Sequence, residues 1–142
     1  MNNSLTKKLK VYLCDLTHDT IIMVSDTVPI NIGFIASYMK DQFGDNVEIS
    51  LFKYPNDVID AIKSNPPDMI CLSNYSWNSN LSEYVASIAK KFNSNVITTQ
   101  GGTNFPHQPI LQKEFLSSRL NTDIYAILEG ERSCSNIVQR IL

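Results

Sequence analysis

Two polar loops hold the residues of this chain that are best placed to bind a ligand. Residues 73–80 read SNYSWNSN and offer hydroxyl and amide groups beside two aromatic rings. Residues 100–105 read QGGTNF, where Gly101 and Gly102 leave the backbone without side chains. Paired glycines adopt backbone angles closed to other residues and let a flat ligand or another chain approach closely. An ordinary turn between a strand and a helix also explains such a pair, and the second polar loop is what favours binding.

Reactive side chains are not grouped for catalysis. No nucleophile stands beside a plausible base, and no two carboxylates form an acid–base couple. His18 and Asp19 could hold a metal ion, but loop histidines are more often solvated, so no metal site is predicted. The three cysteines are isolated and lack the spacing of a zinc or iron–sulfur site. An enzyme acting alone on a small phosphorylated substrate is a minor alternative.

The loop after the first predicted strand argues against two nucleotide chemistries. Asp15-Leu16-Thr17-His18 has none of the glycines of a dinucleotide site, and it lacks the glycine of a flavodoxin-type phosphate loop. A receiver domain that is phosphorylated on aspartate needs Asp at the end of its third strand and Lys at the end of its fifth. This chain has Ser73 and Leu128-Glu129 there. The receiver interpretation therefore fails at its central residue.

Composition restricts the class of protein. The chain has 142 residues, 43% hydrophobic and 18% charged, which suits one globular domain over residues 1–142 with a polar tail at 1–8. Its net charge of −2, without a block of Lys or Arg, gives no case for nucleic acid. No apolar run is long enough for a membrane span, and the start does not read as a signal peptide. Isolated cysteines suit a reducing compartment, so a cytoplasmic protein is expected.

Hydrophobic periodicity predicts five strands that alternate with five helices. Strands are expected at residues 10–14, 47–52, 68–73, 96–99 and 124–128. Helices are expected at residues 29–44, 56–65, 81–92, 106 or 109–116, and 133–142. This alternation is typical of an α/β fold with helices on both faces of a parallel sheet, joined by right-handed crossovers. We expect a flavodoxin-like, Rossmann-like three-layer fold with a five-stranded parallel sheet in the order 2-1-3-4-5.

Such a sheet binds ligands outside the carboxyl ends of its strands, near the point where strand order reverses. The loops at that edge are residues 15–28, 74–80 and 100–105. All five helices are expected to cover the sheet, which leaves no helix to form a lid over a ligand.

Four short segments together resemble the cobalamin-binding domain that precedes the catalytic barrel in one class of radical S-adenosylmethionine enzymes. They are PINIG onward to Tyr38 at residues 29–38, PDMICLS at 67–73, the pair Gly101-Gly102, and residues 123–131 with Glu129-Gly130-Glu131. Their order and spacing extend over about residues 9–142. The resemblance implies cobalamin over the carboxyl edge of the sheet, with its nucleotide tail beside the third and fourth strands.

The resemblance also implies which residues would meet the cofactor. Gly101 and Gly102 would leave a cleft for the tail, and small polar side chains would reach its base and phosphate. Aromatic side chains at 75, 77 and 105 could contact the corrin rim, although surface packing explains them equally well. The predicted cofactor-binding residues are Ser73, Asn74, Tyr75, Ser76, Gly101, Gly102, Thr103, Glu129 and Gly130.

Three departures from the family pattern refine this expectation. The cobalt-ligating motif D-x-H-x-x-G is not matched, because His18 falls one place late and the glycine is missing, so no histidine ligand to cobalt is expected. The usual Gly-Glu-Gly-Glu begins with Leu128 here. The C-x-x-x-C-x-x-C of an iron–sulfur cluster is absent.

The sequence is therefore interpreted as a cobalamin-binding module and a fragment of a longer radical S-adenosylmethionine protein. The iron–sulfur cluster and S-adenosylmethionine would belong to a barrel domain in the same or another polypeptide. No catalysis is expected from this chain alone. The alternative is a relative of the same fold that has lost its ligand and acts as an interaction or structural domain.

Overall fold

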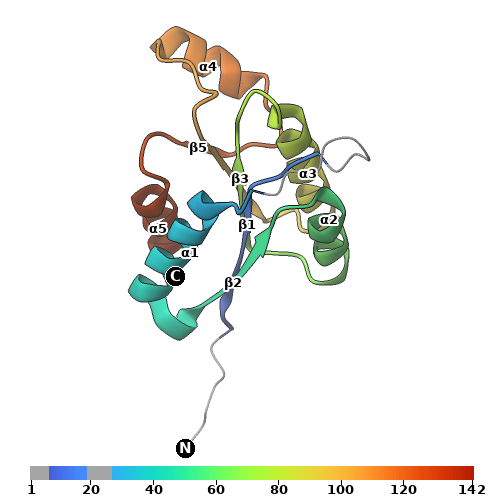
Figure 1. Ribbon diagram of the computed structural model, residues 1–142, viewed down its shortest axis with the longest axis vertical. Coiled ribbons are helices and arrows are strands. Elements are labelled where there is room, and N and C mark those ends of the chain that lie inside the picture. Colours follow the sequence, from blue (N-terminus) through green and yellow to red (C-terminus); the bar gives the residue numbers. More distant parts are fainter. Residues whose placement is uncertain (1–6, 19–26) are drawn as a thin grey trace, which may run out of the picture.

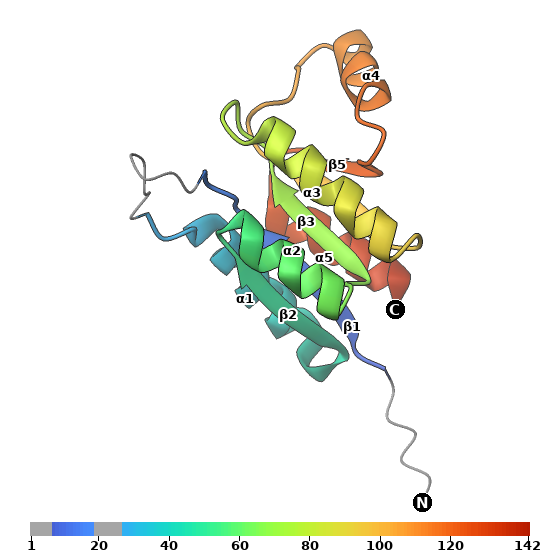
Figure 2. The ribbon, with the colours of Figure 1, turned by 90° about the vertical axis from the view of Figure 1, so that its right-hand side faces the viewer.

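The computed structural model, which describes residues 7–18 and 27–142, contains a five-stranded parallel sheet with helices on both faces (Figures 1 and 2). The strand order is β2-β1-β3-β4-β5, as predicted. Asp19 and most of the first predicted edge loop lie outside the described residues. The strands are β1 Leu9–Cys14, β2 Val47–Phe52, β3 Met69–Ser73, β4 Ile97–Gly101 and β5 Ile124–Ala126.

Each crossover between strands contains a helix. Pro55 and Pro109 stand at the first position of their helices, where a missing N–H costs nothing. No helix in the described part of the chain is both long and apolar enough to cross a membrane. The helices are α1 Ile30–Phe43, followed by the 3-10 turn Gly44–Asn46, then α2 Pro55–Ser64, α3 Ser79–Phe92, α4 Pro109–Ser117 and α5 Gly130–Ile141.

Successive side chains along each strand pack alternately into two separate hydrophobic cores. Val11 and Leu13 of β1 face α1 and α5, whereas Tyr12 and Cys14 face α2 and α3. This alternation follows from the period of two in a strand, and strands covered on both faces are apolar throughout. In Figure 1, α1 and α5 lie on one side of the sheet and α2 and α3 on the other.

Helix α4 does not cover the sheet, so the expectation that all five helices do so is wrong. It lies beyond the carboxyl ends of the strands (Figure 1) and buries none of its residues. Ile110 is 67% exposed. Phe115 reaches back to the sheet, where it meets Phe105 and Tyr125 edge-on at 5.3 and 5.8 Å between ring centroids.

The ends of β4 and β5 and the start of α5, all at the carboxyl edge, also differ from the prediction. Strand β4 continues through Gly101, because Gly101 pairs with Ser73 of β3 and its carbonyl accepts a bond of 2.6 Å from the Asn74 N–H. Strand β5 stops at Ala126, and α5 begins at Gly130 instead of residue 133. Leu128, between them, has φ 66° and is 95% exposed, a backbone conformation that non-glycine residues rarely adopt.

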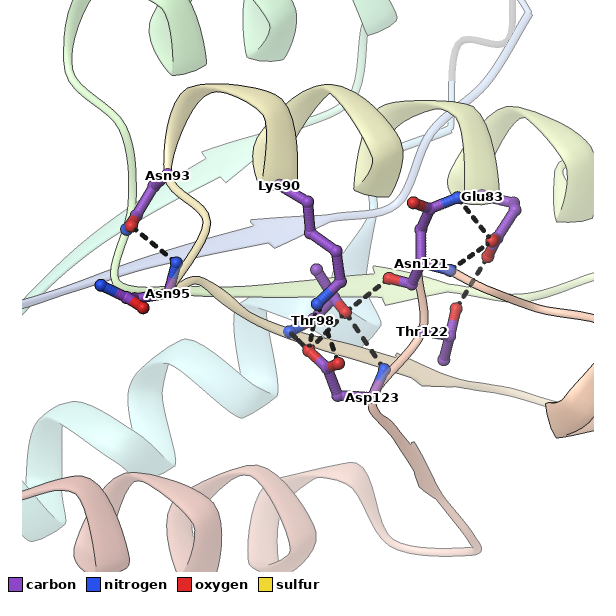
Figure 3. Close-up of polar contacts among 8 residues, drawn as sticks. All are labelled: Glu83, Lys90, Asn93, Asn95, Thr98, Asn121, Thr122 and Asp123. Carbon is purple, nitrogen blue, oxygen red and sulfur yellow. Dashed lines mark hydrogen bonds and ion pairs between the residues drawn. The ribbon is translucent and has the colours of Figure 1, made fainter.

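A polar network joins α3 to the chain entering β5 (Figure 3). The Glu83 carboxylate accepts hydrogen bonds from Asn121 N–H at 2.9 Å and from the Thr122 hydroxyl at 2.8 Å. Asp123 Oδ2 accepts from the backbone N–H of Thr98 at 2.9 Å and from the Thr98 hydroxyl at 2.8 Å. Lys90 of α3 contacts both oxygens of Asp123 at 2.8 Å. The start of β5 is thus held by charged side chains.

The Asp123 carboxyl is stabilised as an anion. Partial burial raises its pKa, but the hydrogen bonds from Lys90 and Thr98 outweigh that effect and hold the pKa below its ordinary value. A carboxyl whose pKa is lower in the folded chain contributes stability above its unfolded pKa of about 3.9, and loses it as pH falls through the folded value.

Replacing Asp123 by Ala should lower the free energy of unfolding by about 1–3 kcal/mol at pH 7, because it strips the buried Thr98 N–H of its side-chain acceptor. The matched control is Asp60→Ala, which removes an exposed pair with Lys63 and should cost less than about 0.5 kcal/mol. Urea unfolding at pH 7 and below pH 4 measures both. The difference in free energy of unfolding between wild type and Asp123→Ala should be smaller below pH 4 than at pH 7. An equal difference at both pH values would contradict the stabilising role of the Asp123 carboxylate.

Candidate functional site

A cavity of about 580 Å³ opens at the carboxyl edge of the sheet. Its sides come from β3, β4 and β5, from α1 and the start of α5, and from the segment that leads into α4. Its volume falls within the usual range of small-molecule sites, about 300–1,000 Å³. The cavity is lined mainly by Asn31, Ile32, Ile35, Cys71, Ser73, Tyr75, Thr99, Gly101, Gly102, Thr103, Phe105, His107, Gln112, Tyr125, Ala126, Leu128, Glu129, Gly130, Glu131 and Cys134.

Most of the cofactor-binding residues predicted from the sequence are brought together here. Seven line the cavity: Ser73, Tyr75, Gly101, Gly102, Thr103, Glu129 and Gly130. Asn74 and Ser76 do not line it. Asn74 is fully buried, with its side chain directed to Asn104.

The glycine loop is fastened to the loop after β3. Gly102 has φ 132°, and a Cβ placed there would lie 2.6 Å from the backbone oxygen of Asn74. Asn104 N–H donates to that same oxygen at 3.2 Å. A side chain at Gly102 would therefore deform the loop itself, so the glycine is needed first for packing between the two loops.

The Ser73 hydroxyl already donates a hydrogen bond within the protein. Its Oγ donates to Asp15 Oδ1 at 2.6 Å and accepts from Asn78 Nδ2 at 3.0 Å. Asn78 Nδ2 also donates to the carbonyl of Leu16 at 3.1 Å, so this network joins the ends of β1 and β3 to the start of α3. Ser73 can thus offer a ligand only an acceptor.

Aromatic rings form the wall on the α4 side. Phe105 stacks on Tyr125 with centroids 3.9 Å apart, and the Tyr125 hydroxyl donates to the Gly102 carbonyl at 3.0 Å. Burial raises the pKa of Tyr125 to about 12, so its hydroxyl stays protonated at neutral pH. Arg119, just after α4, packs over Phe115 and donates to the Ser79 carbonyl at 3.0 Å and to its hydroxyl at 2.6 Å. The aromatic wall is therefore anchored to both β5 and α3.

The cavity floor consists of Cys71, Thr99 and Cys134, which lie farthest from the carboxyl ends of the strands. Cys71 and Thr99 are paired in register on β3 and β4, and Cys134 comes from α5. A hydrogen bond with Cys134, together with burial, raises the pKa of Cys71 well above its ordinary value. Thr99 is 1% exposed, and its hydroxyl has no hydrogen-bond partner.

None of the three floor residues is among the cofactor-binding residues predicted from the sequence. A signal for it existed, because residues two apart in a strand share a face. Ser73 and Gly101 were both expected at the site, and Cys71 and Thr99 precede them by two positions.

Among the described residues, neither histidine stands in a group that could bind a metal ion. His18 Nε2 lies 2.9 Å from the Trp77 carbonyl, to which it donates, and His18 is not on the cavity wall. His107 does line the cavity. Within residues 7–18 and 27–142, no three His, Cys, Asp or Glu side chains gather where they could hold a metal ion.

A second, more open depression of about 760 Å³ lies between α1 and the edge strand β2. Ser37, Lys40 and Glu48 are among its lining residues. It contains no glycine loop and does not lie at the switch point of the sheet, which is where open α/β sheets bind ligands. It serves below as a control surface.

Solved structures share this fold at low sequence identity. A cobalamin-binding protein from Desulfitobacterium hafniense DCB-2 is 14% identical with a TM-score of 0.66; the match covers 96% of this chain and 60% of that protein's length. The pilus assembly protein CpaE from Caulobacter crescentus CB15 is 9% identical with a TM-score of 0.59, covering 95% and 100% of the two chains. A response regulator receiver protein from Sinorhizobium medicae WSM419 is 16% identical with a TM-score of 0.53, covering 93% and 90%.

These likenesses establish the flavodoxin-like fold. The comparison with curated proteins found no match. The family model of the B12 binding domain, however, matches residues 21–138, most of the chain. The chain belongs to the B12-binding domain family.

Proposed function

We propose that this chain is the cobalamin-binding module of a radical S-adenosylmethionine enzyme. The corrin ring would lie across the carboxyl edge of the sheet, and the nucleotide tail would enter the cavity between the sheet and α5. The observation that carries the proposal is the cavity itself, which runs from the glycine loop down to Thr99 in a chain of the B12-binding family.

The residues present fit a nucleotide tail. Gly101 lies on the same face of β4 as Thr99 and leaves that part of the cavity wall without a side chain, and the Thr99 hydroxyl is buried without a partner. The first N–H groups of α5 lack partners within the helix and favour an anionic phosphate. Glu129 and Glu131 oppose that charge from the same turn, so backbone N–H groups and Thr103 are the expected phosphate contacts.

The chain's own residues would hold and orient the cofactor. Bound cobalamin supplies a cobalt centre for alkyl-transfer or radical chemistry. The Phe105–Tyr125 stack would exclude water from the tail, and the Ser73–Asp15 hydrogen bond would fix the edge beneath the ring.

The proposal of a radical enzyme rests on the four matching segments described above. The iron–sulfur cluster and S-adenosylmethionine would be held by a barrel domain, in cis or in trans. Exposed apolar side chains at the cavity mouth suit a covering domain: Ile127 is 52% exposed and Leu128 95%. The three cysteines of the chain are free, and we propose a cytoplasmic setting, where thiols stay reduced.

Blocking the cavity mouth tests the placement. Thr103→Trp should weaken binding of hydroxocobalamin by at least about tenfold, because a large ring replaces an exposed small side chain on the wall. Ser37→Trp makes the same kind of change in the depression between α1 and β2 and should leave binding unchanged. Titration followed by absorbance measures both, with circular dichroism to verify folding. The reverse result would place the ligand beside β2.

Cobalt should receive no nitrogen ligand from this chain. His18 donates to the Trp77 carbonyl, and His107 stands on the segment leading to α4. The absorbance and electron paramagnetic resonance spectra of bound cobalamin should therefore be the same in His18→Ala, His107→Ala and wild type. A spectral change in either variant would identify that histidine as a ligand.

The isolated chain should bind cobalamin weakly, with a dissociation constant in the micromolar range or above. One edge of one domain can cover only the lower face of a corrin ring, whereas tight sites bury most of their ligand. Isothermal titration of the chain alone, and of a longer polypeptide that includes the neighbouring domain, measures the difference. Tight one-to-one binding by the monomeric chain would contradict a pocket shared with a second domain.

A further inference from the structure

We propose that the cavity floor selects the nucleotide base of the cofactor, through a hydrogen bond to Thr99, and favours a base with a polar edge such as adenine over 5,6-dimethylbenzimidazole. The inference rests on the proposed function, because it assumes that a nucleotide tail occupies the cavity. It goes beyond that function by naming the class of tail.

The inference of base selection is based on the Thr99 hydroxyl. It is 1% exposed, lines the cavity and has no hydrogen-bond partner. Buried polar groups in folded proteins are nearly always paired, so the unpaired hydroxyl of a residue that lines a cavity is a candidate contact for a ligand. Gln100 Oε1 is unpaired too and Gln100 also lines the cavity, but its side chain lies on the opposite face of β4, where its Nε2 donates to Glu83 at 3.3 Å.

The neighbours of Thr99 do not satisfy it. Cys71 stands beside it in register on β3, and neither Cys71 nor Cys134 makes a hydrogen bond to the Thr99 hydroxyl. Both thiols are buried, and the neighbouring Cys134 thiol, together with burial, raises the pKa of Cys71 well above its ordinary value. The three floor residues include no Asp, Glu, Lys, Arg or His, and thiols are weak hydrogen-bonding groups, so the Thr99 hydroxyl is the strongest donor and acceptor of the floor.

The position of the floor makes the base the relevant part of the tail. Thr99 lies two residues inside the end of β4, whereas Gly101 lies at that end. In a tail that enters beside Gly101, the terminal base reaches deepest. A hydroxyl both donates and accepts, which suits the amino group and ring nitrogens of a purine. The outer edge of 5,6-dimethylbenzimidazole carries two methyl groups and no polar atom, so this edge would leave the hydroxyl unpaired. Sites that hydrogen-bond a polar group discriminate strongly against analogues that lack it.

The binding test uses two cobamides that differ only in the base, adenine or 5,6-dimethylbenzimidazole, each titrated to millimolar concentration. Wild type should prefer the adenine form by about tenfold or more. Thr99→Val, which keeps the shape and removes the hydroxyl, should abolish the preference, and Thr99→Ser should keep it. Ser135→Ala is the control, since its buried hydroxyl is also unpaired but does not line the cavity.

A second measurement needs no ligand. If the Thr99 hydroxyl exists for a ligand, Thr99→Val should raise the melting temperature of the ligand-free chain by roughly 2–6 °C, because it removes an unsatisfied buried group. A fall in melting temperature would show a structural hydroxyl and overturn the inference.

Equal affinity for the two cobamides, or a preference that survives in Thr99→Val, would overturn the base selection and leave the proposed function standing. Failure of the folded chain to bind either cobamide at millimolar concentration would overturn both.

Discussion

The close contact between Gly102 and the Asn74 carbonyl determines the shape of the whole carboxyl edge. It brings the loop after β4 onto the loop after β3, so that Asn104 can pair with both the backbone and the side chain of Asn74. The Tyr125 hydroxyl then reaches the Gly102 carbonyl and ties β5 to the same point. Three strand ends are thus joined where no side chain fits between them.

The polar groups on the two faces of the sheet differ in how fully they are hydrogen-bonded. On the α3 face, the carboxylates of Glu83 and Asp123 are saturated with hydrogen bonds and hold β5 in place (Figure 3). On the opposite face, the cavity floor is neutral and holds an unpaired hydroxyl. Charge stabilises the scaffold, while the site itself keeps an uncharged floor.

The strand order and the division into two cores could be predicted, because apolar alternation and the crossovers between strands specify them. Val47 to Phe52 was predicted to the residue. The position of α4 could not be predicted, since Ile110 and Leu111 follow the pattern of a packed helix yet remain exposed. Their exposure depends on the path of the chain from Gly102 to Gln108, which no periodicity encodes.

The location of the candidate site could be predicted from the sequence, but the hydrogen bonds within it could not. The two loops were identified correctly as neighbours. The sequence did not reveal, however, that the Asn74 side chain binds Asn104 of the glycine loop or that the Ser73 hydroxyl donates to Asp15. Such commitments depend on partners about 30 and 60 residues away in the chain. Leu128 is the converse case, because a departure visible in the sequence became a backbone conformation that favours glycine.

The isolated position of α4 has a consequence for how a bulky molecule reaches the cavity. The helix is held by Phe115 against two rings and by Arg119 at the start of α3, and it shares neither of the two cores. Segments with so few buried contacts open at a small fraction of the global unfolding free energy. Detaching α4 would remove Gln112 from the cavity lining and take the support of Phe115 away from the Phe105–Tyr125 stack, while the sheet and the other four helices stay folded. The rate of association would then be governed by this local opening, and amide hydrogens of α4 would exchange with solvent long before those of β1 and β3.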